Sequence, residues 1–101
     1  MANHHPLNAL SDPTRREILK LLRAGSKTAG EISDEFHLSK PTLSHHFRIL
    51  RAAGLVRAER RGTTIVYTLQ SNVIEDLAAE LLDLVAPALS VSSRRKKVST
   101  R

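Results

Sequence analysis

LSKPTLSHHFRILRAAGLV, residues 38–56, is the stretch that decides the fold of this chain. Leu43, Phe47 and Leu50 recur at i, i+4 and i+7, which places them on one face of a helix. A proline stands near the start of this pattern and a glycine at its end, and both suit helix boundaries. The stretch therefore predicts an amphipathic helix over residues 40–53.

The opposite face of this predicted helix is hydrophilic, and Ser39 or Lys40 precedes it as a cap. Its residues are small and polar or long and basic, with no acid among them: Thr42, Ser44, His45, Arg48 and Arg51. Hydroxyl and guanidinium groups can donate hydrogen bonds to base edges and phosphates. This face therefore suits a negatively charged groove such as the major groove of DNA.

The residues on both sides complete a larger motif. A short helix is predicted over about residues 28–36, where Thr28 and Glu31 match a capping box. A tight turn joins it to the main helix, and together they make a helix-turn-helix. Two strand-like runs follow at 55–61 and 64–69, rich in β-branched residues in the second run. A β-hairpin in this place is a wing.

Two further helices are predicted before this unit, over residues 6–10 and 13–24. A last helix is predicted over residues 72–90, with Ser71-Asn72 as its cap. The rest of this small domain offers too little surface to cover the apolar stripe of the last helix. Self-association would remove this stripe from water. The predicted interface residues are Leu7, Leu10, Val73, Ile74, Leu77, Leu81, Leu82 and Val85.

The elements together predict a mainly α fold, an α+β winged helix-turn-helix of four helices, two strands and a fifth helix. One domain is expected over residues 1–91, and residues 92–101 are expected to form a disordered basic tail. The chain contains no apolar run long enough for a transmembrane helix and no visible signal peptide, so a cytoplasmic location and no membrane partner are expected.

The net charge of +6 is unevenly distributed. Residues 39–61 carry six basic side chains against one acid, whereas residues 62–91 carry four acids and no base. The last ten residues add five bases. A basic block on a patterned helix and hairpin is the electrostatic signature of nucleic-acid binding.

Three segments carry a resemblance to a known family: LSDPTRREILKLL at 10–22, LSKPTLSHHFRIL at 38–50, and AGLVRAERRG at 53–62 with Tyr67 after it. Together they resemble the ArsR/SmtB family of winged-helix repressors over about residues 6–90. The SKPTLSHH form, in a chain without cysteine, is most similar to the metal-independent SdpR-type autorepressor branch.

The resemblance implies a homodimer that binds a palindromic operator on double-stranded DNA and blocks transcription. The predicted DNA-binding residues are Ser39, Lys40, Thr42, Ser44, His45, Arg48, Arg51, Arg57, Arg60 and Arg61. Arg48 is expected to reach a guanine edge, and Ser39, Lys40 and Arg51 to hold phosphates. The wing arginines Arg57, Arg60 and Arg61 are expected to contact phosphates or the minor groove. Each arginine could instead be a solvated charge, and Ser44 could bond back to its own helix.

The roles of Arg15 and Arg16, and that of His46, are open to more than one interpretation. Arg15 and Arg16 could touch the DNA backbone, but solvated charges are the favoured interpretation. His46 stands three residues after Leu43, so it leans toward the apolar face and is read as a packing or hydrogen-bonding residue.

No metal cofactor is expected. The chain has no cysteine, and the last helix offers four acids (Glu75, Asp76, Glu80 and Asp83) but no histidine, although zinc prefers nitrogen and sulfur ligands. His4-His5 with an acid is a weak alternative. No nucleophile is paired with a base, so catalysis is not expected.

Two rival functions stay open: a nonspecific, chromatin-like DNA-binding protein, and a winged-helix module that docks on a partner protein. The sequence names no inducer, which leaves a small molecule, a partner protein or the concentration of the chain itself as the signal.

Overall fold

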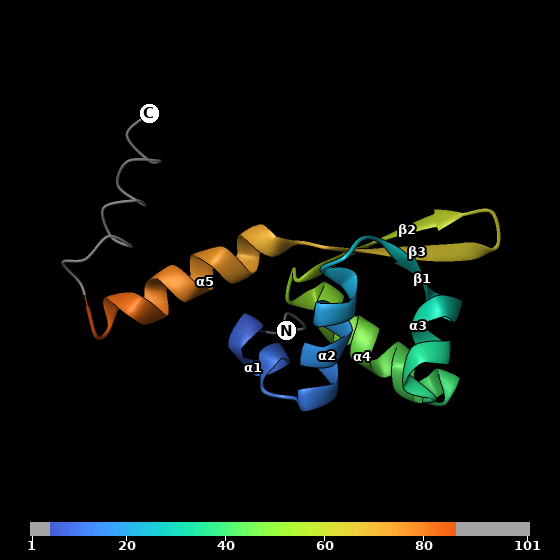
Figure 1. The fold of residues 1–101 in the computed structure, drawn as a ribbon, viewed down its shortest axis with the longest axis horizontal. Coiled ribbons are helices and arrows are strands. Elements are labelled where there is room, and N and C mark those ends of the chain that lie inside the picture. Colours follow the sequence, from blue (N-terminus) through green and yellow to red (C-terminus); the bar gives the residue numbers. More distant parts are fainter. Residues whose placement is uncertain (1–4, 87–101) are drawn as a thin grey trace.

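The computed structural model describes residues 5–86, which form a helical body with a small antiparallel sheet (Figure 1). The elements follow in the order α1 (Pro6–Leu10), α2 (Pro13–Leu22), β1 (Lys27–Thr28), α3 (Ala29–Phe36), α4 (Lys40–Ala52), β2 (Val56–Arg61), β3 (Thr64–Leu69) and α5 (Ser71–Asp83). This is the winged helix-turn-helix that the sequence predicts. The predicted tail at 92–101 and the Pro87 break lie outside the described residues.

The sheet has three strands in the order β1-β3-β2, so the predicted order of elements lacked one strand. Lys27 pairs with Tyr67 and Thr28 with Val66. Thr28 is also the cap of α3, with the predicted capping box to Glu31 in place. A capping residue adopts extended backbone angles, which lets it pair with a strand at the same time. Because Thr28 was interpreted only as a helix cap, strand β1 was not predicted.

The ends of α4 are closed as the sequence predicts. Ser39 is the N-cap, and its hydroxyl accepts a hydrogen bond from the backbone N–H of Thr42 at 3.3 Å. At the other end Gly54 has φ +78°, a conformation that glycine adopts without strain. The N–H of Leu55 donates to the carbonyl of Leu50 at 3.0 Å, which completes a Schellman motif and turns the chain into the wing.

The predicted caps of α5 are wrong. The helix begins at Ser71 after Gln70, which makes no side-chain cap. The backbone N–H of Gln70 donates to the carbonyl of Leu55 at 2.9 Å, so hairpin pairing continues to this residue and Ser71 is the first residue free to turn into a helix. The helix ends at Asp83, before the predicted residue 90, and α2 ends at Leu22 rather than at residue 24.

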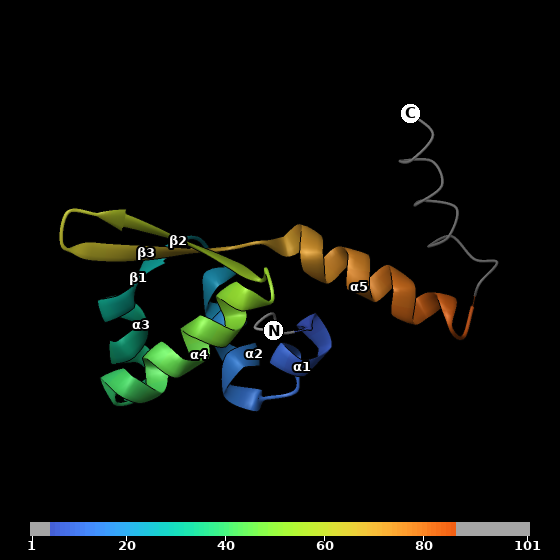
Figure 2. The same cartoon turned by 180° about the vertical axis from the view of Figure 1, so that it is seen from behind.

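The core lies where α2, α3 and α4 cover the sheet, while α5 extends away from the body on the side opposite the hairpin turn (Figures 1 and 2). The fully buried side chains of the core include Ile18, Ile32, Leu50 and Leu55. The ring of Phe47 stacks on Tyr67 of β3, with 3.8 Å between ring centroids and 13° between ring planes. Helix α4 and the wing therefore share one packed unit.

Arg15 is a buried charged residue, only 8% exposed. Its Nε donates to the carbonyl of Ala9 at 2.8 Å, and its Nη1 lies 3.3 Å from Nδ1 of His46. The interpretation of Arg15 as a solvated charge is therefore wrong: its guanidinium joins the end of α1 to the middle of α4. Arg16 is exposed and donates to the carbonyl of Leu10 at 2.8 Å.

Replacing Arg15 with Met is expected to lower the free energy of unfolding by about 1–3 kcal/mol, because buried carbonyls in α1 lose their donor. Urea denaturation at one fixed protein concentration measures the change. Arg23→Met, at an exposed position after α2, is the matched control and should leave the midpoint in place. Equal midpoints for the two variants would show that the buried guanidinium contributes nothing to stability.

Candidate nucleic-acid interface

The outer face of α4 is open to solvent over its whole length. The predicted groove-reading residues Thr42, Ser44, His45 and Arg48 are all exposed, as are Ser39, Lys40 and Arg51. The inner residues Leu43, Phe47 and Leu50 are buried, as predicted, and Ile49 joins them. The helix is therefore held by one face and presents the other.

The hydroxyl groups on this face differ in their freedom to bind. Ser39 donates to Oγ1 of Thr42 at 2.9 Å, so these two side chains also serve the helix end. Within residues 5–86 Ser44 makes no bond back to its helix, in contrast to the alternative interpretation. Its hydroxyl is available to a ligand.

Three arginines meet in a groove of about 480 Å³ between α4 and β2. Arg48 and Arg51 come from the helix and Arg57 from the strand, while Ala52, Val56 and Ala58 complete the lining. Arg57 also donates to Oε1 of Gln70 at 3.4 Å, which orients it. Arginine residues on both walls of an open groove form a site suited to a phosphate backbone.

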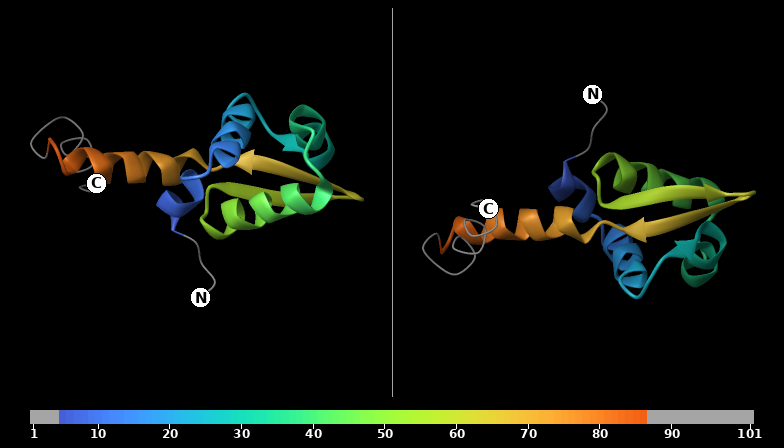
Figure 3. Two further views of the ribbon diagram at one scale, coloured as in Figure 1. Left: turned by 90° about the horizontal axis from the view of Figure 1, so that it is seen from below. Right: turned by 90° about the horizontal axis from the view of Figure 1, so that it is seen from above.

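The turn of the hairpin projects beyond the helices, which both views of Figure 3 show. Arg60 and Arg61 are exposed near this turn, where Gly62 adopts φ +65°. Arg61 lies 3.3 Å from a carboxylate oxygen of Glu59 in an exposed ion pair, which contributes little to stability. The wing arginines are therefore placed to meet a partner outside the body.

His46 lies off the outer face of α4 and is half-buried, as predicted for a packing or hydrogen-bonding residue. Because a guanidinium is always a donor, Nδ1 of His46 accepts from Arg15 and the imidazole is neutral. Burial lowers the pKa of His46 below its ordinary 6.5; Asp12 partly offsets this, and Arg15 and His45 add to the lowering. Asp12 caps α2, and its carboxylate accepts a hydrogen bond from the backbone N–H of Arg15. This hydrogen bond lowers the pKa of Asp12 below 3.8.

The predicted interface residues fall into two groups. Leu77 is buried within one chain, and Leu10, Val73 and Ile74 are half-buried against the core. Leu7, Leu81 and Leu82 are between 43% and 47% exposed, and Val85 is 79% exposed. Leu84, which was not among the predicted residues, is 78% exposed. A single chain therefore leaves five apolar side chains exposed on α1, on the second half of α5 and directly after it, and we call these five residues the apolar strip.

No group of three His, Cys, Asp or Glu side chains within residues 5–86 is arranged to hold a metal ion. His4, the weak alternative ligand of the sequence, lies outside this range. Among the same residues, no helix is long and apolar enough to cross a membrane.

Comparison with known proteins adds an independent observation. Residues 12–58 match the family described as bacterial regulatory protein, arsR family. The transcriptional repressor SdpR of Bacillus subtilis is 44% identical over 77 residues, which cover 76% of this chain and 86% of that protein. The chain belongs to the arsR family.

Other members agree with this assignment. The arsenical resistance operon repressor of Staphylococcus xylosus is 38% identical over 78% of this chain and 75% of its own length. The solved structure of an ArsR-like transcriptional regulator from Rhodococcus sp. RHA1 superposes with a TM-score of 0.71 at 28% identity, over 91% of this chain and 83% of that one.

This arsR-family member is therefore a DNA-binding transcriptional regulator of a repressor family and not an enzyme, as the sequence predicts. The individual DNA contacts and the interface residues stay predictions. The sequence did not predict that Arg15 is buried and joins α1 to α4, because charge alone does not distinguish a buried guanidinium from a solvated one.

Acidification is expected to destabilise the fold through His46. Its pKa is lower in the folded chain than in the unfolded chain, so the unfolded state takes up a proton first as the pH falls. Stability from this residue is complete above pH 6.5 and declines as the pH falls through that value. Urea denaturation at pH 7.5 and 5.5 measures the loss.

His46→Gln should reduce this pH dependence, since an amide oxygen can still accept from Arg15 but does not titrate. The matched control is His45→Gln on the exposed face, which should retain most of this pH dependence, because His45 is the smallest cause of the shift in the pKa of His46. An unchanged pH slope in His46→Gln would assign the loss to other groups.

Proposed function

We propose that this arsR-family regulator is a homodimer that represses transcription at a palindromic operator, without a metal cofactor. Two features of the chain together support the proposal: the exposed basic surface of α4 and the wing, and the apolar strip. A second copy is the occupant with the matching chemistry, since a two-fold axis brings the same strip against itself. The absence of cysteine supports the metal-independent part.

The energetic argument for a dimer is simple. Fully burying a leucine or valine contributes about 1.5–3 kcal/mol, and five such side chains on this strip are exposed in one chain. A two-fold dimer also presents two copies of α4 to the same face of a duplex. Two recognition helices related in this way read an inverted repeat with half-sites about one helical turn apart.

Selection from a library of random duplexes tests the DNA part directly. We expect enrichment of an inverted repeat and an affinity for it about a thousandfold or more above that for a shuffled duplex at physiological salt. Titration should give two chains per site. Equal affinity for selected and shuffled DNA would favour the nonspecific, chromatin-like alternative.

Arg48→Ala is expected to weaken binding to the selected operator by about 1–3 kcal/mol and to relax the preference at one base position. Arg60→Ala should instead weaken binding to all sequences alike and reduce the salt slope by about 1, because a wing arginine meets phosphates. Competition titrations against base-substituted duplexes at two salt concentrations separate these effects. Arg23→Ala is the control. Full operator affinity in Arg48→Ala would remove Arg48 from base reading.

Leu81→Glu is expected to shift the chain from dimer to monomer, because it places a charge in the apolar strip. Analytical ultracentrifugation over a range of concentrations measures this shift. Asn72→Glu adds the same charge at an exposed, non-apolar position of α5 and should leave the dimer intact. A Leu81→Glu chain that sediments as the unsubstituted one does would contradict the proposed interface.

The metal-independent part has its own test. Operator affinity should be the same after treatment with a chelator and after addition of zinc. A metal-dependent change would show that the regulator senses metal through residues outside 5–86 or through a shared site between chains.

A further inference from the structure

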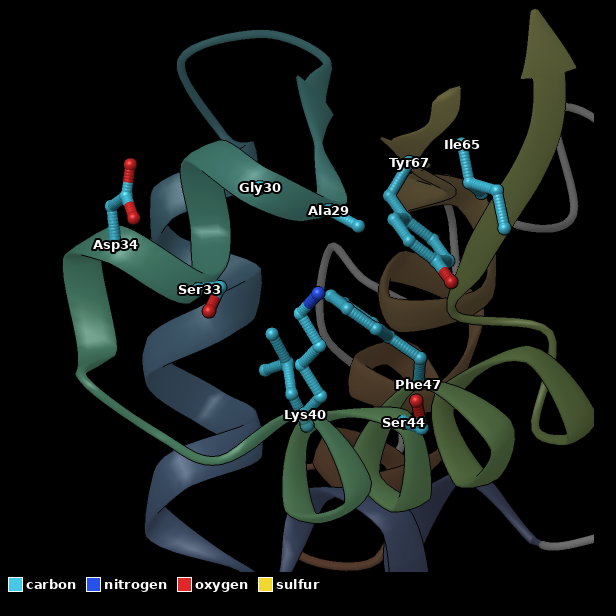
Figure 4. A pocket seen from close by; sticks show the side chains of 10 residues that line it. Ala29, Gly30, Ser33, Asp34, Lys40, Ser44, Phe47, Ile65 and Tyr67 are labelled. Carbon is cyan, nitrogen blue, oxygen red and sulfur yellow. The ribbon is translucent and has the colours of Figure 1, made fainter. Parts of the chain in front are cut away.

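The wing and the helix-turn-helix line a second, half-open cavity, distinct from the arginine groove. It has a volume of about 390 Å³ and lies between α3, the first half of α4 and β3. This volume is in the range of pockets that bind small molecules, about 300–1,000 Å³. Figure 4 shows it from close by.

The walls of this cavity are largely apolar. Phe47 and Leu43 approach it from α4, Ile65 from β3 and Ala29 from α3. The stacked ring of Tyr67 forms a further wall and is only 6% exposed. Such a lining favours a flat or aliphatic body that is removed from water.

A few polar groups face the same space. Lys40, Ser33 and Ser44 line the cavity, and Figure 4 shows the ammonium group of Lys40 and the hydroxyl of Tyr67 directed into it. Within residues 5–86 none of these four side chains has a hydrogen bond or ion pair to another group of the protein. No side-chain oxygen or nitrogen that is buried within residues 5–86 lacks a partner, so these four polar groups are reached by solvent and are available to a ligand.

The charge of the cavity determines which ligand fits. Lys40 supplies a positive charge, and the hydroxyl groups can donate hydrogen bonds to an oxygen anion. Burial raises the pKa of the Tyr67 hydroxyl above 10.0, with Arg51 acting in the opposite direction, so the hydroxyl keeps its proton as a donor. Asp34 also lines the cavity, but its carboxylate points away from Lys40 and Tyr67 in Figure 4.

We propose that this cavity binds a small aromatic carboxylate, with the ring against Phe47 and Ile65 and the carboxylate on Lys40, and that the ligand weakens operator binding. The second part rests on the proposed function. Lys40 and Ser44 belong both to the cavity and to the predicted DNA-binding set, so the ligand and the operator compete for the same groups. Such coupling is reciprocal: DNA weakens ligand binding by the same factor.

The chain offers an internal reporter for this test. Tyr67 is its only tyrosine, it has no tryptophan, and this tyrosine lines the cavity. Binding of 3-phenylpropionate to the full chain, without DNA, is followed by tyrosine fluorescence and by calorimetry. We expect saturable binding of one molecule per chain. The neutral amide of the same acid should bind at least tenfold more weakly, because it lacks the charge that Lys40 pairs with.

Two variants locate the site. Lys40→Gln should weaken binding of the acid about tenfold and leave that of the amide unchanged. Ser33→Leu should fill the cavity and abolish binding of both, while operator affinity is retained, because Ser33 is not in the predicted DNA-binding set. Glu35→Leu makes the same substitution at an exposed position of α3 outside the cavity, and is the matched control.

The second measurement is operator affinity at saturating 3-phenylpropionate. We expect a fall of tenfold or more in the unsubstituted chain and no change in Ser33→Leu. No saturable binding, equal affinity for acid and amide, or unchanged binding in Ser33→Leu would overturn the ligand site. Saturable binding with unchanged operator affinity would overturn the coupling. A chain that binds the acid but no selected operator would refute the proposed function and leave the ligand site standing.

Discussion

The stacking of Phe47 on Tyr67 is the contact on which the other functional features depend. Phe47 belongs to the inner face of the recognition helix and Tyr67 to the central strand of the sheet, and their rings lie 3.8 Å apart. This contact sets the position of α4 relative to the hairpin. The arginine groove lies on the β2 side of this junction, and the apolar cavity lies on the α3 side. One packed pair therefore positions both the predicted DNA-binding arginines and the candidate ligand site.

Arg15 makes the corresponding connection at the other end of the body. Its guanidinium is hydrogen-bonded to carbonyls of α1 and to His46 of α4, so the helix that carries part of the apolar strip is tied to the helix that is predicted to bind DNA. A buried charge has a large desolvation cost unless it is fully hydrogen-bonded. The cost is offset here by bonds that only this arrangement of three helices provides, which makes the arrangement specific.

Much of the fold could be predicted because its signals are local. The caps Thr28 and Ser39, the glycine stop at Gly54 and the period of Leu43, Phe47 and Leu50 each act within a few residues. The errors arose where distant residues decide. Strand β1 exists because Lys27 and Thr28 meet β3 across the fold, and α5 begins at Ser71 because Gln70 pairs with Leu55.

The sequence by itself determined the class of protein: a basic, amphipathic recognition helix, a wing, and motifs of the arsR family. It did so because helix periodicity, capping and charge pattern are properties of neighbouring residues. The tertiary structure alone decided which groups meet. Arg57 joins Arg48 and Arg51 in one groove, Arg15 is buried rather than solvated, and Lys40 faces the same cavity as Tyr67. These meetings depend on packing between elements far apart in the chain, which no local pattern encodes.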